Sequence, residues 1–462
     1  MLPDEVLLET FDFFVNEDPE KIEEWITLIH VCQRWRGVVF QSPRRLNLQL
    51  LCTHKKRARD TLDIWPSLPL VIRHVIFDDE PPVVDNIIAA LERNDRVCRI
   101  ELNCLSSPQL GYITDSEEMQ KPFPKLTDLH LSMLVDGSDG LGPTLPDSFL
   151  GGTAPRLQSL ILCGIPFPGL PKLLLSATQL VELDLFNIFP SGYIPPEAMA
   201  TSLSALSSLK SLYFIFQSPR PRPAPQGRLP PPLTRSILPS LTRLGFMGTS
   251  EYLEEILARV DAPRLNKLNI VYFNQIIFDT PQLFQFILRR PTLRAPEVGF
   301  IKISQGITVE FSSQTLNNIV LSVRIRCTAS EWQLSSLEQV CTSSLPPVST
   351  LEDLVILEDP EDPPRWQDDV ENTLWLELLH PFAAVKNLFL RSELVPRIAP
   401  ALQELVGGRT TEVLPALENV FLAGIRASEP ICEGIEKFVA ARRLTSHPVA
   451  IWDDDSIIEA DG

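Results

Sequence analysis

The sequence lacks the patterns by which most catalytic and metal sites are recognised. It has no Gly-x-Ser-x-Gly, phosphate loop, His-Glu-x-x-His or glycine-rich dinucleotide turn, and its six histidines are isolated. Its eight cysteines include no Cys-x-x-Cys, so zinc and redox spacings are also missing. We therefore predict a non-enzyme with no catalytic residues, no metal site and no cofactor. An enzyme with an unrecognised carboxylate site is the alternative, since 59 acidic residues offer many pairs.

The sequence also lacks long hydrophobic runs and an excess of basic residues. No apolar stretch approaches the ~20 residues that span a bilayer. The formal net charge of −18 disfavours broad binding to nucleic acid or anionic membranes, and we predict neither as a partner. No secretory leader pattern begins the chain, so we expect free thiols in a reducing compartment and a cytoplasmic or nuclear location. The run H-K-K-R-A-R at 54–59 fits a nuclear-localisation patch or, better on an acidic chain, a solvated loop.

The chain is long and has ample apolar residues. At 462 residues and 44% hydrophobic, it exceeds what one compact core usually allows. We expect either several domains or one extended array of repeats.

Residues 1–45 predict a small helical module. Pro3, Asp4 and Glu5 suit the first turn of a helix, and the spacing of Leu7, Phe11 and Phe14 predicts one apolar face. A second helix is expected from about residue 20 to residue 40, with an apolar stripe at Leu28, Val31, Cys32, Trp35 and Val39. Two helices this short must pack on the rest of the chain or on another protein. Periodicity alone leaves two roles open, a cap for the rest of the chain and a docking surface.

The residues themselves resemble an F-box. The resemblance lies in L-P-D-E-V-L-L-E-T-F from residue 2 and I-H-V-C-Q-R-W-R-G-V-V-F-Q-S-P from residue 29, and it covers roughly residues 2–45. The sequence of this stretch, continuing into S-P-R-R-L-N-L, looks like the expanded F-box families of mushroom-forming fungi. One departure is the segment 16–24, which is longer and more acidic than the usual link between the first two F-box helices.

The resemblance implies docking on a Skp-family adaptor and, through it, on a cullin. The implied contacts from the first helix are Leu2, Pro3, Val6, Leu7 and Phe11. The resemblance also implies roles for four residues of the second helix, divided between contact with the adaptor and the module's own core. They are Leu28, Val31, Cys32 and Trp35.

A phrase of the form apolar-x-x-apolar-x-apolar recurs behind this module. It begins at Val97, Leu126, Leu157, Leu180, Leu209, Leu241, Leu265, Leu316, Leu351, Val385 and Leu417. Most steps lie at or a little beyond the 20–29 residues of a leucine-rich repeat. The longest step, from Leu265 to Leu316, predicts a degenerate unit near residues 298–303. A proline often stands two residues before the phrase, as at the entry to a strand.

These repeats predict the fold class. We expect an α/β protein in which a small N-terminal helical F-box is followed by a curved leucine-rich-repeat-like solenoid with a parallel sheet. The expected parts are the module at 1–45, a connector and array cap at 46–95, the array at 96–452 with a proline-rich loop at 217–239, and an acidic tail at 453–462. A conventional α/β domain with coincidental leucine spacing is the alternative.

The outward positions of the expected strands form a possible face for a target protein, because aromatic, apolar and charged groups are mixed there. They are Asp128, His130, Ile161, Asp184, Phe186, Tyr213, Lys267, Asn269, Phe389 and Phe421. The expected function is that of a substrate receptor in a cullin-RING (SCF-type) ubiquitin ligase, with an unknown target. A non-degradative interaction scaffold is the alternative.

Overall fold

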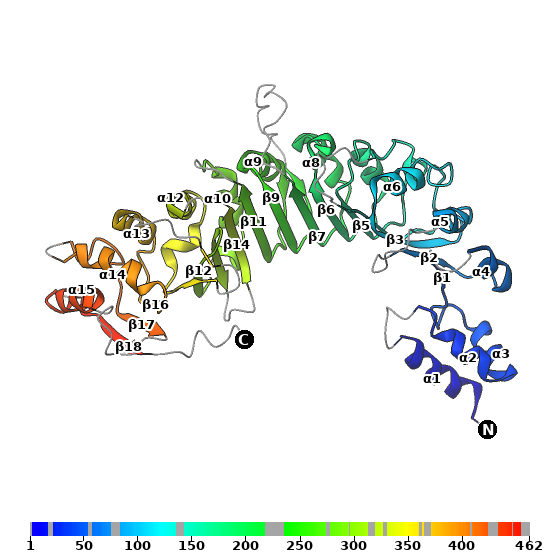
Figure 1. Cartoon of the computed structure of the whole chain (residues 1–462), viewed down its shortest axis with the longest axis horizontal. Coiled ribbons are helices and arrows are strands. Elements are labelled where there is room, and N and C mark those ends of the chain that lie inside the picture. The colour runs from blue at the N-terminus through cyan, green and yellow to red at the C-terminus, as the bar shows by residue number, and fades with distance from the viewer. Residues whose placement is uncertain are drawn as a thin grey trace. The chain divides into compact units, whose positions relative to one another are not determined.

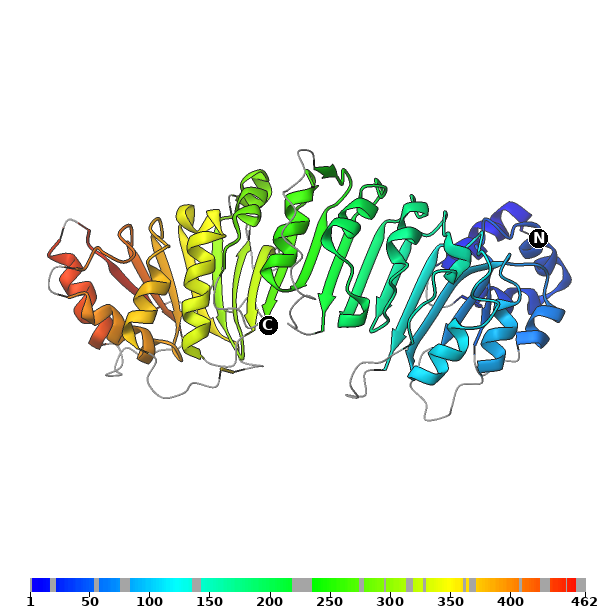
Figure 2. The same ribbon diagram turned by 90° about the horizontal axis from the view of Figure 1, so that it is seen from above.

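The computed structural model forms two compact units, Met1–Leu209 (unit 1) and Lys210–Gly462 (unit 2). It describes residues 2–16, 22–53, 58–74, 84–134, 143–217, 235–273, 278–294, 296–312, 319–326, 330–359, 363–364, 371–406, 409–423, 433–445 and 447–453. Figure 1 shows strands alternating with helices along the chain, and Figure 2 shows the same elements from above.

Unit 1 begins with three short helices where the sequence predicted two. They are α1 (Asp4–Asn16), α2 (Trp25–Val31) and α3 (Gln33–Gln41). The predicted second helix is wrong in its continuity, because Cys32 adopts an extended conformation with φ −161° and ψ 168°. The Cys32 sulfur accepts a hydrogen bond from the Trp35 backbone N–H, so it caps a new helix. Val31 and Trp35 therefore do not share a continuous helical face.

The sheet of unit 1 is parallel and runs in chain order. Its strands are β1 (Leu50–Cys52), β2 (Leu70–His74), β3 (Val97–Leu105), β4 (Asp128–Met133), β5 (Ser159–Cys163) and β6 (Glu182–Ile188). The sheet starts with β1 and β2, inside the segment predicted as a connector and cap.

Helical segments follow the strands of unit 1 and cover one side of its sheet (Figure 2). They are α4 (Ala58–Ile64), α5 (Val84–Leu91), α6 (Ser107–Thr114), η1 (Phe149–Gly152), α7 (Leu170–Ser176), η2 (Pro190–Gly192) and α8 (Pro196–Leu203). The inward leucines of the strands, such as Leu129, Leu160 and Leu183, are fully or almost fully buried against them. Each strand thus shows an inner face to the helices and an outer face on the opposite side.

Unit 2 continues the same pattern in a sheet of order β7-β9-β11-β14-β13-β12-β15-β16-β17-β18. Its strands are β7 (Ser211–Phe216), β9 (Arg243–Gly248), β11 (Lys267–Phe273), β12 (Val298–Ile303), β13 (Ile307–Ser312), β14 (Ile319–Arg326), β15 (Asp353–Glu358), β16 (Asn387–Arg391), β17 (Asn419–Ala423) and β18 (Ala450–Asp453). A separate pair joins β8 (Ser236–Ile237) to β10 (Val260–Asp261). Its helical segments are α9 (Ser250–Arg259), α10 (Pro281–Leu288), α11 (Pro291–Arg294), α12 (Ser330–Ser343), η3 (Pro346–Thr350), α13 (Asn372–Leu379), α14 (Val395–Glu404) and α15 (Glu433–Arg443).

The long repeat step corresponds to a break in the parallel pattern. A strand does lie at 298–303, as predicted, but β12, β13 and β14 form an antiparallel meander. β14 pairs in parallel with β11, and β12 pairs in parallel with β15. The predicted unit near 298–303 is therefore present as β12, and β13 is the additional strand, antiparallel to both β12 and β14.

The predicted α/β class, with N-terminal helices followed by a leucine-rich-repeat-like solenoid on a mostly parallel sheet, is confirmed. Nearly every recurring phrase leads into a strand two residues later, as Leu126 leads into β4 and Leu417 into β17. Most of the proline-rich loop (218–234), the basic run at 54–57, much of the acidic segment after 359 and the tail after 453 lie outside the described residues.

Candidate interaction surfaces

The helical module divides its apolar residues between a core and a surface, a division that the sequence left open. Leu7, Phe11 and Leu28 are 6%, 1% and 6% exposed and form the module's own core. The ring of Phe11 packs against that of Trp35 at 4.7 Å between centroids, and Trp35 is half-buried. The implied adaptor contacts at Leu7, Phe11 and Leu28 therefore lie inside the module.

The remaining implied contacts are exposed. They are Leu2, Pro3, Val6, Val31 and Cys32. Leu2 and Val31 are each more than half exposed. Arg34 joins the start of α1 to the start of α3, because its guanidinium donates to the Asp4 carboxylate at 2.9 Å and to the Leu2 carbonyl. The exposed ends of these two helices are thus held side by side. We call these five residues the module surface.

Sequence reasoning missed one exposed aromatic residue beside this surface. Phe13 is 74% exposed and lies seven residues after Val6, so the two share the outer side of α1. The seven-residue spacing was the available signal, but the buried stripe through Leu7 and Phe11 lies on the other side of the same helix.

The module is attached to the first strand of the sheet. Trp25 is fully buried, its indole Nε1–H donates to the Gln49 carbonyl at 2.9 Å, and its ring meets Trp65 edge-on at 5.5 Å. The Glu23 carboxylate accepts from the Leu51 backbone N–H at 3.3 Å. Because Leu50 N–H bonds towards β2, Gln49 and Leu51 present their backbone groups to the opposite edge of β1. The module therefore covers an otherwise open strand edge.

The outer face of unit 1 brings most of its predicted residues together. In register across β4, β5 and β6, His130 faces Ile161, which faces Asp184. Asp128 starts a parallel row through Ser159 to Glu182. Asp184 is only 8% exposed, while His130, Ile161 and Phe186 are half-buried.

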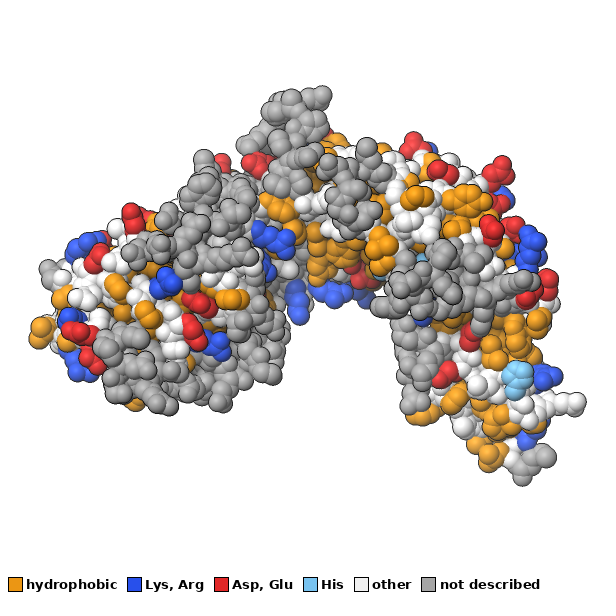
Figure 3. Space-filling view, in the orientation of Figure 1, with side chains coloured by type: hydrophobic (Ala, Val, Ile, Leu, Met, Phe, Trp, Pro, Cys, Tyr) orange, Lys and Arg blue, Asp and Glu red, His pale blue; other side chains and the backbone are white. Residues whose placement is uncertain are grey.

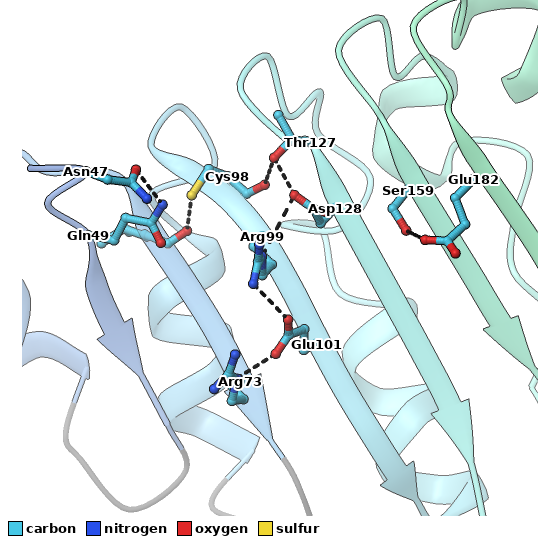
Figure 4. A network of polar contacts seen from close by, with 11 residues as sticks. Asn47, Gln49, Arg73, Cys98, Arg99, Glu101, Thr127, Asp128, Ser159 and Glu182 are labelled. Atoms are coloured by element: carbon cyan, nitrogen blue, oxygen red, sulfur yellow. Dashed lines mark hydrogen bonds and ion pairs between the residues drawn. The ribbon is translucent and has the colours of Figure 1, made fainter. Parts of the chain in front are cut away.

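A network of charged side chains extends this face over β2 and β3 (Figure 4). Arg73 Nε lies 2.5 Å from a Glu101 oxygen, and Arg99 reaches both Glu101 at 3.4 Å and Asp128 at 3.8 Å. The Thr127 hydroxyl donates to Asp128 at 2.6 Å. The sequence did not single out Arg73, Arg99 or Glu101. These arginines are already neutralised by carboxylates, so the network links strands more than it offers free charge.

The pKa of His130 is lowered even though the carboxylates of Glu101 and Glu182 act to raise it. Burial lowers its pKa, and this outweighs the opposite effect of Glu101 and Glu182. The imidazole is therefore neutral at physiological pH and contributes a polar, uncharged group to the face.

In unit 2, three of the predicted residues share the outer face of neighbouring strands. Lys267 and Asn269 are exposed on β11, two residues apart. Tyr213 on β7 is in register with Gly245 on β9, which is in register with Asn269. The outward positions of these strands thus form one accessible surface.

The other two predicted residues belong to an aromatic cluster. Phe389 is 5% exposed and packs with Phe300 and Val355, so it is mostly inaccessible. Phe421 is half-buried and stacks on Phe389 at 4.4 Å with an interplanar angle of 12°. Trp452 on β18, which the sequence-based prediction missed, is in register with Phe421 and 53% exposed.

A polar ladder runs beside the aromatic cluster. Asn387 donates to Asp353 at 2.6 Å, and Asn419 donates to Asn387 at 2.8 Å. The Trp452 indole N–H donates to Asn419 at 2.9 Å. The registers β15–β16 and β16–β17 place Asp353, Asn387 and Asn419 in one line, and Trp452 reaches Asn419 from the next outward position of β18.

The described residues offer little for metal or thiol chemistry. They include no group of three or more His, Cys, Asp or Glu side chains placed to hold a metal ion. The six described cysteines are free, and burial raises the pKa of Cys98 to about 11. Burial also raises the pKa of Cys341, so both thiols stay protonated at neutral pH. Among the described helices, none has the length and apolar character of a membrane span.

Comparison with known proteins gives a distant structural likeness only. No family model and no curated protein matches the chain. Among solved structures, it is similar to the leucine-rich repeat-containing protein LegL7 from Legionella pneumophila, with 13% identity and a TM-score of 0.29, over 85% of this chain and 97% of that one. The fold assignment rests on the strand order and repeating unit described above.

Proposed function

We propose that this chain is a substrate receptor of a cullin-RING (SCF-type) ubiquitin ligase. In this proposal the module surface docks a Skp-family adaptor and the outer sheet face holds a target protein. The observation that carries it is the module surface itself. Residues 2–45 resemble an F-box, and apolar positions of that resemblance stay exposed on a module whose core is already filled.

The mechanism would be one of proximity. The chain performs no bond chemistry in this proposal, and it raises the effective concentration of the target's lysines near the ubiquitin-charged enzyme. The leucine-rich-repeat-like fold supports a protein-binding role, because such arrays present a broad outer face. The contacts of Trp25 and Glu23 with β1 support it further, because they fix the module to the sheet of unit 1.

Co-purification with an adaptor tests the docking step. We would co-express the chain with a Skp-family adaptor, beside a Val6→Asp, Val31→Asp variant. Both positions are exposed, so the variant should fold and lose the adaptor. The matched control is Ile64→Asp, Leu175→Asp, which makes the same change at exposed apolar residues outside the module. Adaptor retained by the first variant, or absent from the wild type, would contradict the proposal.

Buried positions are unsuitable for this test. Leu7→Asp or Phe11→Asp would put a carboxylate into the module core and unfold it, so loss of binding there would not report on docking. Circular dichroism and a thermal melt on every variant keep the two effects apart.

A reconstituted ligase separates a receptor from a scaffold. A partner captured by the outer face should be ubiquitinated with the wild-type chain and not with Val6→Asp, Val31→Asp. Adaptor binding without ubiquitination of any captured partner would favour the non-degradative scaffold.

A further inference from the structure

The outer face of β7, β9, β11 and β14 carries unpaired basic side chains on an acidic chain. Arg243, Lys267 and Arg326 are exposed, and none forms an ion pair with another described residue. The described outward positions of these four strands include no Asp or Glu. With a net charge of −18 over the whole chain, this concentration of positive charge is a local feature that complements an acidic ligand.

The strand register places these groups at two levels. Arg243 and Lys267 face each other in the first row of β9 and β11. Arg326 is in register with Phe273, which is six residues further along β11. At ~3.3 Å per residue, the two levels lie about 20 Å apart. Beyond β14, Lys302 is already paired with Glu310 at 3.2 Å, which limits the free positive charge on that side.

Apolar side chains fill the space between the two levels. Tyr213, Ile215, Met247 and Val271 are half-buried on the outward side. Gly245 lets the Tyr213 ring lie over β9, because a Cβ at Gly245 would come within 2.1 Å of that ring. Figure 3 shows hydrophobic side chains gathered over these strands with Lys and Arg beside them.

We propose that this basic face, made of Arg243, Lys267, Arg326, Tyr213, Ile215, Met247 and Val271, binds an acidic extended segment of the target protein. The segment would carry carboxylates six residues apart with apolar side chains between them, because an extended chain of that length spans the two basic levels. This inference rests on the proposed function in taking the ligand to be part of a target. Charge complementarity selects the segment, and the apolar middle supplies the buried area.

The test uses the full-length chain and a labelled peptide, Asp-Ser-Leu-Ser-Leu-Ser-Asp, followed by fluorescence anisotropy. We expect saturable binding that weakens as salt rises. Arg243→Glu, Lys267→Glu should lower the affinity at least tenfold. The matched control, Arg156→Glu, Lys172→Glu, makes the same charge change at exposed positions of unit 1 and should leave binding unchanged. A peptide with Lys in place of both Asp should not bind.

Three outcomes would overturn this inference. One is equal binding by wild type and the Arg243→Glu, Lys267→Glu variant. Another is tighter binding of a single-stranded oligonucleotide to the same face. The third is peptide binding only after removal of residues 454–462, which would make the chain's own acidic end the occupant. These substitutions lie on β9 and β11, outside the module surface, so we expect adaptor co-purification to be unchanged and the two assays to fail independently.

Discussion

At the scale of single residues, exposure decides which side chains can meet a partner. The spacing of Leu7 and Val31 marked both as apolar positions of the N-terminal module, but only Val31 is exposed. Helical periodicity reports which residues share a face and not what that face contacts. The module surface could therefore be identified only after the helices were placed.

His130 gives a residue-scale prediction about pH. Burial holds its pKa below the ordinary value of about 6.5, so the unfolded chain binds this proton more readily than the folded one. Stability from the neutral imidazole is fully present above pH ~6.5 and is lost as the pH falls from there through the folded-state pKa. We expect His130→Asn to lose less stability than the wild type between pH 7.5 and 5.5. Amide hydrogen exchange along β4 at the two pH values would measure this difference in stability.

The control for this prediction is Ile161→Val, a change without a titrating group at the position beside His130 on β5. It should follow the wild-type pH dependence. Identical behaviour of His130→Asn and the wild type would show that the imidazole does not couple to folding.

At the scale of elements, the sequence located the strands better than their directions. The phrases beginning at Leu126 and Leu417 lead into β4 and β17, because alternating inward leucines and an entry proline are local signals. The antiparallel β13 was not predicted, because pairing direction depends on which strand is the neighbour and not on local residues. The break at Cys32 was missed for a similar reason, since a cysteine cap has no strong sequence signature. The aromatic stack of Phe389 on Phe421 required the register between β16 and β17.

The polar ladder through Asn387 leads to a prediction at the scale of elements. Asn387→Ala removes hydrogen bonds to Asp353 and Asn419 at once, and it leaves both partners half-buried without that contact. We expect a loss of about 1–3 kcal/mol in the free energy of unfolding, measured by urea titration. Hydrogen exchange should rise in β15–β17 first.

An exposed asparagine supplies the comparison for the ladder. Asn266→Ala lies just before β11 and should change the free energy of unfolding by no more than ~0.5 kcal/mol. If both variants lose the same stability, the ladder contributes nothing beyond a surface asparagine.

At the scale of the whole molecule, an array of parallel strands needs protection at its ends. Each strand exposes backbone groups that only a neighbour can satisfy, and an open edge invites pairing with another chain. In unit 1 the helical module provides that protection, since Trp25 and Glu23 bond to backbone groups on the outer edge of β1. The contacts that cap β1 and the exposed residues proposed for docking thus lie on different parts of the module.

This double use predicts that the module cannot be removed without cost to the array. A chain starting at residue 46 would uncover the edge of β1 and the ring of Trp65. We expect it to aggregate in size-exclusion chromatography under conditions in which the full chain stays monodisperse.

Trp25→Ala should lower the free energy of unfolding of unit 1 by about 3–5 kcal/mol. Trp25→Phe, which mainly loses the hydrogen bond to Gln49, should lower it by about 1–2 kcal/mol. The Val6→Asp, Val31→Asp variant is the control, because it alters the exposed side of the module only and should leave the stability of unit 1 unchanged. A soluble, stable array lacking residues 1–45 would show that the edge of β1 needs no cover, and it would exclude the capping role of the module.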